Sequence, residues 1–552
     1  MPQKDNMTKR WGVIIGIAVL SFLSGGWLLQ RGATATLDTM NAARLFDEVR
    51  ARVRSAYVDS IPESELYRRA TRGMLEELHD PYSVLLAGDD YKDLTEKTSG
   101  NYAGLGIQID VRDGGIMVVA PLPDTPAERA GIESGDIITA VEGKSTEGWT
   151  NEQALKALRG EAGTKVTIAV RRPGVSEPIK FTLTRAPIHV RSVPPGTMFD
   201  GNIGYIALTS VSETSADELR DEIAAMRKKG MKAMILDLRA NPGGLLEQGV
   251  QVTDLFLEPK QQIVATRGRA PGSTREFNDR APQLYPELPI VVLVNEFSAS
   301  AAEIIAGALQ DHDRALVVGT PTFGKGLVQS LYTIDDSTAL KLTTAKWYTP
   351  SGRSIQREAK NEDDQLLQAM VDGDASRARA ADSARVRDTS VAARPIFKTD
   401  AGREVRGGGG IVPDMIVRRD TLTTGERAFA EALGEKASVY RDVLTSYALE
   451  LKSAKAVGSE SFTVTPAMQQ EIYRRLTARG VSLTPKQFEQ GSQLIRDQLG
   501  YELARYVFGR PGEFRRRAKD DPQVRKAIEL LTRAHTPKDL LSIASPPPAP
   551  AK

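Results

Sequence analysis

The sequence contains no cysteine and only four histidines in 552 residues. The absence of cysteine excludes a thiol nucleophile, a disulfide framework and zinc sites built from thiolates. No HExxH pattern is present. We therefore expect no metal site and no cofactor, and a Ser-His-Asp triad has few candidates for its base. The histidines are His79, His189, His312 and His535.

Neither sign of charge is in excess. The 73 basic residues nearly balance the 71 acidic ones, for a net charge of +2. Because nucleic-acid-binding chains usually carry a basic excess, we expect no nucleic-acid partner. A chain of this length is too long for one hydrophobic core, so three or four domains are expected.

One long apolar run is present, at the N-terminus. Residues 11–29 carry no charge and follow Lys9 and Arg10. The run is about long enough to span a bilayer. We expect residues 1–31 to be a membrane anchor or signal, and favour an uncleaved anchor because a signal has a shorter apolar region. The basic flank stays inside, so the expected location is the cytoplasmic membrane, single-pass, with the rest on the periplasmic or other extracytoplasmic side.

Hydrophobic periodicity divides the first part of the chain into three regions. Apolar residues spaced by three and four predict a helical region at 36–98. Residues 99–187 alternate strand-like segments with two short helices, each preceded by Thr and followed by Gly. Residues 188–356 and 395–420 alternate apolar strands with helices, which predicts a mostly parallel sheet covered on both faces.

Three further segments have other compositions. Residues 357–394 are rich in Ala, Arg and Asp without an apolar stripe, and predict a charged mobile insertion. Residues 421–543 predict a second helical region, with a helix start at TPKQ. Residues 544–552, rich in proline, predict a disordered tail. The predicted fold class is thus multidomain α/β with helical N- and C-terminal regions.

Two serines stand close together in LVNEFSASAAEIIAG, residues 293–307. Ser300 and Glu303 have the spacing of a capping box, so the simplest role of Ser300 is to cap a helix. The same position also suits catalysis. A serine between a strand and a helix lies at the positive helix end, and the N–H of Ala301 would point at a developing oxyanion.

A nucleophilic serine needs a base. His312 is twelve residues further along the same predicted helix, or about 18 Å, which is too far from Ser300. Lys325, in TFGKGLVQ, could serve if desolvation lowers its pKa from ~10.4 to about 7–8. Its glycine neighbours allow close backbone approach, and Gln329 could hold the amine. The alternative is an ordinary exposed loop lysine.

The segment LDLRANPGG, residues 236–244, ends a predicted strand with a glycine pair. Such turns present backbone N–H groups to an anion, so one of these glycines and Ala301 could form an oxyanion hole. The alternative is a tight turn that needs glycine for its dihedral angles. GTPTFGKG, residues 319–326, resembles a phosphate loop, but the following residues predict strands rather than the required helix.

The segment YAGLGIQI, residues 102–109, places Gly104, Leu105, Gly106 and Ile107 ahead of a strand. Such a loop can bind the terminal carboxylate of a peptide while the strand edge pairs with that peptide. Alone, this pattern is a weak signal for such a loop. It becomes a strong one because PAERAGIESGDIITAVEG and two further strands follow it.

Together these segments resemble the C-terminal processing peptidases, tail-specific PDZ serine proteases of the S41 family. The resemblance covers residues ~40 to 420 and includes DPYS, YAGLGI, LDLRANPGG, NEFSASAAEIIAGALQD, GTPTFGKGLVQ, SGRSIQ and GGGGIVPD. It implies a ClpP/crotonase-like protease core with a PDZ domain. Phe297 stands where many members have glycine, and Ala302 where many have serine.

The resemblance implies a Ser-Lys dyad. Ser300 matches the nucleophile, Lys325 the base and Gln329 the residue that orients the lysine. Ala301 and a glycine of the ANPGG turn match the oxyanion hole; Gly243 is preferred, with Gly244 as the alternative. Ser298 then belongs to the loop.

The expected function is a serine endopeptidase of the cell envelope that recognises substrate C-termini through its PDZ domain. The alternatives are a catalytically silent PDZ adaptor, which would not need the dyad, and an acyl-CoA hydratase of the crotonase type, which would not need the PDZ region. The expected partners are proteins or peptides with accessible C-termini and the membrane, through residues 11–29. Because family members often associate through terminal helices, a homodimer or higher oligomer and a regulatory partner are compatible with the sequence, and residues 421–543 could dock a partner or assemble protomers.

Overall fold

The computed structural model describes residues 40–112, 115–172, 175–357, 394–418 and 422–544. The apolar run at 11–29, nearly all of the expected insertion at 357–394 and nearly all of the tail at 544–552 lie outside these residues. Within them, no helix combines the length and the apolarity that crossing a membrane requires. The membrane anchor therefore stays a prediction.

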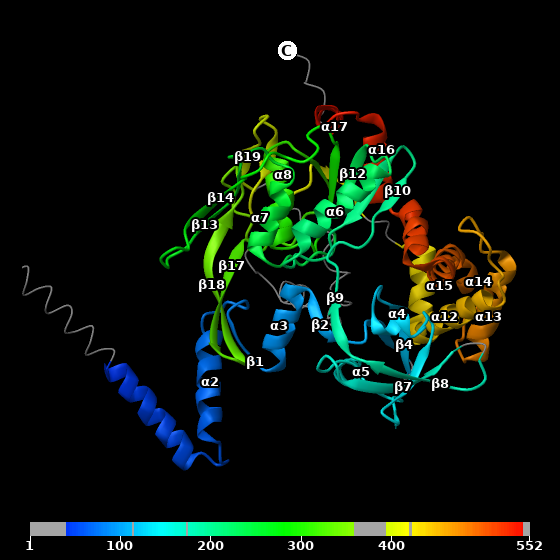
Figure 1. Ribbon diagram of the computed structural model, residues 1–552, viewed down its shortest axis with the longest axis horizontal. Coiled ribbons are helices and arrows are strands. Elements are labelled where there is room, and N and C mark those ends of the chain that lie inside the picture. Colours follow the sequence, from blue (N-terminus) through cyan, green and yellow to red (C-terminus); the bar gives the residue numbers. More distant parts are fainter. Residues whose placement is uncertain (1–39, 113–114, 173–174, 358–393, 419–421, 545–552) are drawn as a thin grey trace, which may run out of the picture. The chain divides into compact units, whose positions relative to one another are not determined.

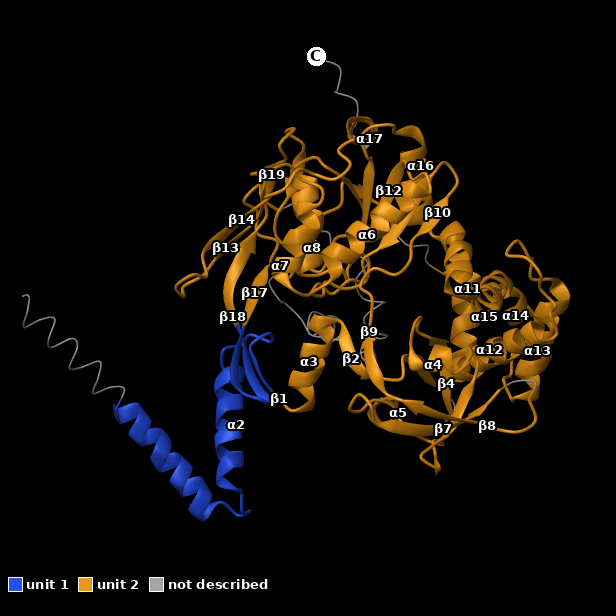
Figure 2. Ribbon diagram, in the orientation of Figure 1, with its two compact units in different colours: residues 1–86, 331–342 blue, residues 87–330, 343–552 orange. Residues whose placement is uncertain are grey.

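The chain divides into two compact units, residues 1–86 with 331–342 and residues 87–330 with 343–552 (Figure 2). The smaller unit contains a helix over residues 40–56, α2 (Glu63–Glu76), most of β1 (Val84–Ala87) and the tip of a hairpin. The helices expected at 36–98 are present. The strand β1 was not predicted, because VLLA is too short an apolar run to show a period.

The candidate PDZ region folds into an antiparallel sheet with two helices, α4 (Pro126–Arg129) and α5 (Asn151–Leu158). Thr150 caps α5 with a capping box, as the sequence predicts. Thr125 precedes α4 but its hydroxyl donates to Leu122 O (2.6 Å) instead of capping the helix. The strand order is β3 (Ile107–Arg112), β4 (Gly115–Pro121), β5 (Ile137–Val141), β7 (Lys165–Arg171) and β8 (Ile179–Thr184), with β6 (Lys144–Ser145) beside β5.

A six-stranded sheet forms the centre of the larger unit. Neighbouring strands are parallel except at the β10 edge, so the predicted, mostly parallel sheet is confirmed. Its order is β10 (Thr197–Phe199), β11 (Ile203–Ala207), β12 (Ala233–Asp237), β15 (Ile290–Val294), β16 (Leu316–Gly319) and β21 (Met415–Ile416).

Both faces of this sheet are covered by helices (Figure 1). Side chains alternate along β12, so Met234 and Leu236 face one core while Ile235 faces the other. The first core is completed by α6 (Ser215–Lys228), α7 (Leu246–Asp254) and α8 (Ala301–Asp311). The second is completed by α16 (Pro522–Arg533) and α17 (Pro537–Ala544). The last helices of the chain are therefore part of the central core.

The preceding helices of the C-terminal region form their own core around Phe429, Ile472 and Leu499. TPKQ begins α14 with a complete capping box at Thr484, as predicted. The helix α15 is kinked at Gly509, where φ is 70°. These helices are α11 (Thr424–Leu433), α12 (Ala437–Ser453), α13 (Pro466–Ala478), α14 (Pro485–Gln490) and α15 (Ser492–Asp520), with a short 3-10 turn at Gly434–Lys436.

The remaining described strands form three small sheets, one of which is the pair of β2 (Asn101–Gly104) and β9 (Ala186–His189). β13 (Gln262–Arg267) pairs with β14 (Arg275–Asn278) and with β18 (Thr338–Tyr348), which forms a hairpin with β17 (Leu327–Asp335). β19 (Ile396–Lys398) pairs with β20 (Glu404–Arg406).

Candidate active site

Ser300 lies between β15 and α8, at the strand-to-helix junction that the sequence predicts. Its φ of 54° and ψ of −117° are rare for a residue with a side chain. Strained backbone of this kind persists only where the surroundings hold it, and it is concentrated at functional sites. The predicted capping box is present, with the N–H of Ser300 donating to Glu303 Oε2 at 2.8 Å.

Ser298 has a different environment. Its side chain is fully buried, and its hydroxyl donates to Leu238 O (2.8 Å) and accepts the N–H of Asn295 (2.9 Å). This hydroxyl therefore stabilises the loop, whereas Ser300 is only partly buried. The geometry agrees with the assignment of Ser300, rather than Ser298, as the candidate nucleophile.

Lys325 is buried, with 8% of its surface exposed. Its two glycine neighbours permit the close approach that the sequence predicts. A Cβ at Gly324 would lie 2.9 Å from Gly410 N, and a Cβ at Gly326 would lie 2.9 Å from Gln356 N. Backbone from two other segments thus packs over both sides of Lys325 and excludes water from it.

Glu303 links these two residues. Its Oε2 accepts the N–H groups of both Ser300 (2.8 Å) and Lys325 (2.9 Å). Its Oε1 accepts the Thr322 hydroxyl and the Gly324 N–H (2.7 Å). The carboxylate is fully buried, and burial raises its pKa even though four hydrogen bonds oppose that shift. One side chain therefore holds the backbones of both candidate catalytic residues.

Sequence reasoning treated Glu303 only as half of a capping box. A second signal was available, since Glu303 is the one charged residue in the apolar stretch AAEIIAGAL. A charged side chain in a buried helix is expected to have several polar partners.

The glycine turn packs against the same helix end. A Cβ at Gly243 would lie 2.8 Å from Ala301 N, and a Cβ at Gly244 would lie 1.8 Å from Val211 O. Both positions therefore require glycine. The Gly243 N–H donates to Asn241 Oδ1 at 2.8 Å. It can bind an oxyanion only after giving up that bond, so the choice between Gly243 and Gly244 stays open.

Gln329 is on β17, where its Nε2 lies 3.5 Å from Thr343 Oγ1. Its expected contact with Lys325 remains a prediction. His312 caps the far end of α8 and contacts Asp400 (2.7 Å), which agrees with its exclusion as the base. Gly326 is followed directly by a strand, which contradicts a phosphate loop. Among the described residues, no group of three or more histidine and acidic side chains could hold a metal ion.

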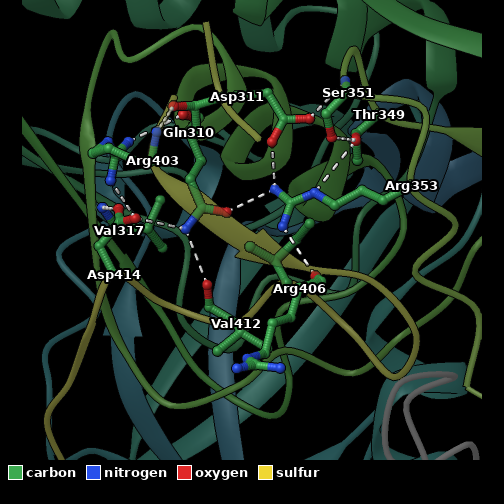
Figure 3. A network of polar contacts seen from close by, with 12 residues as sticks. Gln310, Asp311, Val317, Thr349, Ser351, Arg353, Arg403, Arg406, Val412 and Asp414 are labelled. Atoms are coloured by element: carbon green, nitrogen blue, oxygen red, sulfur yellow. Dashed lines mark hydrogen bonds and ion pairs between the residues drawn. The ribbon is translucent and has the colours of Figure 1, made fainter. Parts of the chain in front are cut away.

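The C-terminal end of α8 is fixed by a buried polar network (Figure 3). Arg353 is fully buried and donates to Asp311 Oδ1 (2.6 Å) and Gln310 Oε1 (2.7 Å) of α8. Burial lowers the pKa of Arg353, although the charge of Asp311 opposes that effect. The SGRSIQ segment is thereby tied to the helix that begins at Ala301, directly after Ser300. This positions Gln356 over Gly326.

The candidate carboxylate-binding loop lies where β2 (Asn101–Gly104) leads into β3. Leu105 is buried in the PDZ core, and its carbonyl accepts the N–H of Ala127 (3.0 Å). Gly106 has a φ of 74°, and a Cβ there would lie 2.3 Å from the Thr125 side chain. Strand β3, which begins at Ile107, is at the edge of its sheet, so its outer side can pair with an added strand.

The phenyl ring of Phe297 packs with Ala299 and Phe323. These residues form a small apolar cluster on the loop that presents Ser300. Phe297, at which the sequence departs from the resemblance, thus lies on the same loop as the candidate nucleophile.

Two family models match the chain. The peptidase family S41 model matches residues 202–365, which include Ser300 and Lys325, and a PDZ domain model matches residues 117–172. A carboxy-terminal-processing protease of Bartonella bacilliformis is 40% identical over 342 residues, which is 61% of this chain and 78% of that protein. The carboxy-terminal processing protease CtpA of Bacillus subtilis is 36% identical over 62% of this chain and 73% of its own length.

Among solved structures, the photosystem II D1 C-terminal processing protease is 28% identical and has a TM-score of 0.34. The match covers 55% of this chain and 82% of that one. The two matches cover 78% and 73% of these relatives' own length. This chain therefore belongs to the carboxy-terminal processing proteases, the PDZ-bearing serine peptidases of family S41.

Proposed function

We propose that this serine peptidase hydrolyses peptide bonds with Ser300 as nucleophile and Lys325 as general base. The observation that carries the proposal is the position of Glu303, whose Oε2 accepts the backbone N–H groups of both residues. The burial of Lys325 favours its neutral amine, which is the form a base must have. The partly exposed position and strained φ of Ser300 suit a nucleophile that substrate must reach.

The proposed reaction proceeds through an acyl-enzyme. The Lys325 amine takes the proton of the Ser300 hydroxyl as its oxygen attacks the substrate carbonyl. Backbone N–H groups of Ala301 and of Gly243 or Gly244 bind the oxyanion. Protonated Lys325 then gives its proton to the leaving amine, and water hydrolyses the ester. Gln329 orients the lysine.

The PDZ domain supplies substrate selection in this proposal. The loop Gly104–Ile107 binds the terminal carboxylate, and the substrate tail adds as a strand to β3. Occupancy of the PDZ domain gates the peptidase site. Phe297 and Phe323 offer an apolar contact for a substrate side chain near Ser300.

We place the enzyme in the cell envelope, held by residues 11–29, because that run is apolar and follows two basic residues. We also propose that it self-associates through the smaller unit, with a regulatory partner as a further component. The support is a set of exposed large apolar side chains on that unit: Leu45, Phe46, Val49, Tyr57, Val58, Tyr67, Met74 and Leu78. Light scattering of wild type and of Phe46→Glu tests this self-association. We expect a lower molecular mass for the variant, and an equal mass for the two proteins would contradict the proposal.

The test of the catalytic proposal uses residues 32–552 and an unfolded protein with a free apolar C-terminus as substrate, with EDTA present. Wild type, Ser300→Ala, Ser298→Ala and Lys325→Ala are compared. We expect wild type and Ser298→Ala to cleave, and the other two variants to be inactive. Cleavage by Ser300→Ala at the wild-type rate would refute the mechanism. If all four proteins bind C-terminal peptides without cleaving, the catalytically silent PDZ adaptor is the better description.

A further inference from the structure

The PDZ sheet is joined to the peptidase by a two-stranded ribbon, which we call the stem. It consists of β2 and β9 (Ala186–His189), paired antiparallel with Asn101 opposite His189 and Gly104 opposite Ala186. One end of β2 is therefore the first glycine of the carboxylate-binding loop. The other end is three residues away, at the peptidase. A structural change at the carboxylate-binding loop therefore has to pass through only this short strand to reach the peptidase.

At the peptidase end of the stem, His189 contacts both strands of the connection and the peptidase itself. Its Nδ1 lies 3.0 Å from Asn101 Oδ1, and its Nε2 lies 2.6 Å from Glu218 Oε1. The side-chain amide of Asn101 is held in this orientation because its Nδ2 donates to Ser99 O at 2.9 Å. A polar contact thus ties the stem to α6.

Glu218 gathers three segments. Besides His189, it accepts the Thr214 hydroxyl (2.7 Å), the Ser192 hydroxyl (3.1 Å) and the Val193 N–H (2.9 Å). Burial alone would raise the pKa of Glu218, but these hydrogen bonds outweigh it and the pKa lies below its usual value. Losing one donor would leave this largely buried carboxylate poorly satisfied.

The segment before Glu218, residues 208–215, is bonded to the glycine turn of the active site. The Val211 N–H donates to Gly243 O, and the Leu245 N–H donates to Val211 O, both at 2.9 Å. At Gly244 even a Cβ would collide with Val211 O. The turn therefore cannot move independently of this segment.

The same segment also controls the Gly243 N–H. Leu208 O accepts Asn241 Nδ2 (2.8 Å), while Asn241 Oδ1 accepts the Gly243 N–H (2.8 Å). A shift of residues 208–211 would pull the Asn241 side chain and release the Gly243 N–H for an oxyanion. The stem side of the segment is held as well, because the Glu213 N–H donates to Thr98 O at 3.0 Å.

We propose that Glu218, with His189, is a positioning residue that couples tail capture at Gly104–Ile107 to the Gly243–Gly244 turn. Tail binding displaces the stem, alters the bonds of Glu218 to His189 and Thr214, and moves residues 208–211. This inference rests on the proposed function. It adds the route by which the PDZ domain acts on the oxyanion donors. Glu218 does not touch substrate.

The experiment compares two peptide substrates that differ only in having a free C-terminal carboxylate or a C-terminal amide. Wild type and Glu218→Gln are tested, with Glu222→Gln as the matched control. Glu222 is one turn further along α6 and accepts the Gly196 N–H (2.8 Å) rather than a stem contact. The kcat and KM of each substrate are measured, and binding of the free-carboxylate peptide is measured by anisotropy in a Ser300→Ala background.

For wild type and Glu222→Gln, we expect a kcat at least about 5-fold higher for the free-carboxylate peptide, the lower end of usual coupling strengths. For Glu218→Gln, we expect equal kcat values, with peptide affinity changed less than about 2-fold. Adding His189→Gln to Glu218→Gln should have no further effect, since both act through one contact.

The inference is overturned if Glu218→Gln keeps the wild-type kcat ratio, if Glu222→Gln loses it to the same extent, or if wild type cleaves both peptides at equal kcat. Failure of the proposed function would give a different result. Wild type would then cleave neither peptide, or Ser300→Ala would cleave both. Thermal unfolding of each variant separates loss of coupling from loss of folded protein.

Discussion

Glu303 Oε2 lies 2.9 Å from the backbone nitrogen of Lys325, although 22 residues separate them in the sequence. The contact joins the first turn of α8 to the loop before β17. Because the same oxygen also accepts the Ser300 N–H, the carboxylate sets the relative position of the two proposed catalytic residues.

Replacing Glu303 with Gln should impair catalysis with little effect on substrate binding. One of the two oxygens becomes an NH2 group, which would face backbone N–H donors and cannot accept from them. We expect kcat to fall by at least about 10-fold with KM nearly unchanged, and stability to fall by about 1–3 kcal/mol.

Steady-state kinetics and chemical denaturation measure these effects. The control is Glu296→Gln, which removes a carboxylate of the same loop that, among the residues the structure describes, accepts only the Thr320 hydroxyl (2.9 Å). A kcat of Glu303→Gln within 2-fold of wild type would show that the backbone alone holds the site.

Ser298→Ala and Ser300→Ala should have opposite effects. Removing the buried Ser298 hydroxyl leaves Leu238 O and the Asn295 N–H without this partner. We expect a loss of about 1–3 kcal/mol in stability with activity retained. Ser300→Ala should abolish activity with a smaller loss of stability, about 1 kcal/mol or less, from its cap on α8. Equal stability of the two variants would contradict the structural role of Ser298.

Gly326→Ala should reduce activity, because its Cβ would meet the Gln356 backbone at 2.9 Å and push it away from Lys325. We expect kcat/KM to fall by at least about 10-fold, since small misplacements of catalytic groups are costly. Gly458→Ala is the control, because a Cβ there meets nothing. If both variants retain wild-type kinetics, close packing around Lys325 is not needed for catalysis.

Asp279 predicts a pH dependence of stability. Burial and the neighbouring carboxylate of Asp254 raise its pKa from 3.8 to about 7. Its Oδ2 has no hydrogen-bond partner among the described residues. Since the folded state holds this proton more tightly, its contribution to stability is complete below about pH 4 and is lost as the pH rises through 7.

Asp279→Asn removes this titration. Between pH 5 and pH 8, we expect wild type to lose roughly 2–3 kcal/mol of stability relative to the variant. Urea denaturation at several pH values measures the difference. Parallel stability curves for the two proteins would show that Asp279 does not titrate in this range.

Leu530→Ala tests whether the end of the chain completes the central core. Leu530 is 1% exposed in the core that α16 forms with the central sheet, so we expect a loss of about 2–5 kcal/mol. Leu422→Ala, at a side chain 41% exposed, should be nearly neutral. For the same reason, a chain ending at residue 420 should be insoluble or inactive. A soluble, active truncation that also keeps its assembly state would refute any essential role for residues 421–543.

Local sequence determines many of the helices, strands and turns of this protein. Features that depend only on neighbouring residues can be read directly from the sequence. They include the apolar strands ILD and IVVLV, the caps at Thr150 and Thr484, and the glycines beside Lys325. The spacing of Ser300, Lys325 and the ANPGG turn carried the family resemblance, which the comparisons confirm. Ser300 and Glu303 show a local capping pattern that is present in the fold.

Only the tertiary structure revealed the long-range contacts. Glu303 reaches Lys325, Arg353 reaches Asp311, and Asn241 reaches Leu208, yet no periodicity encodes such pairs. The assignment of α16 to the sheet core was also invisible, because an amphipathic helix specifies that it must bury a face but not against which partner. Sequence thus determined the elements and the types of catalytic residue, while the packing of distant segments decided which groups meet.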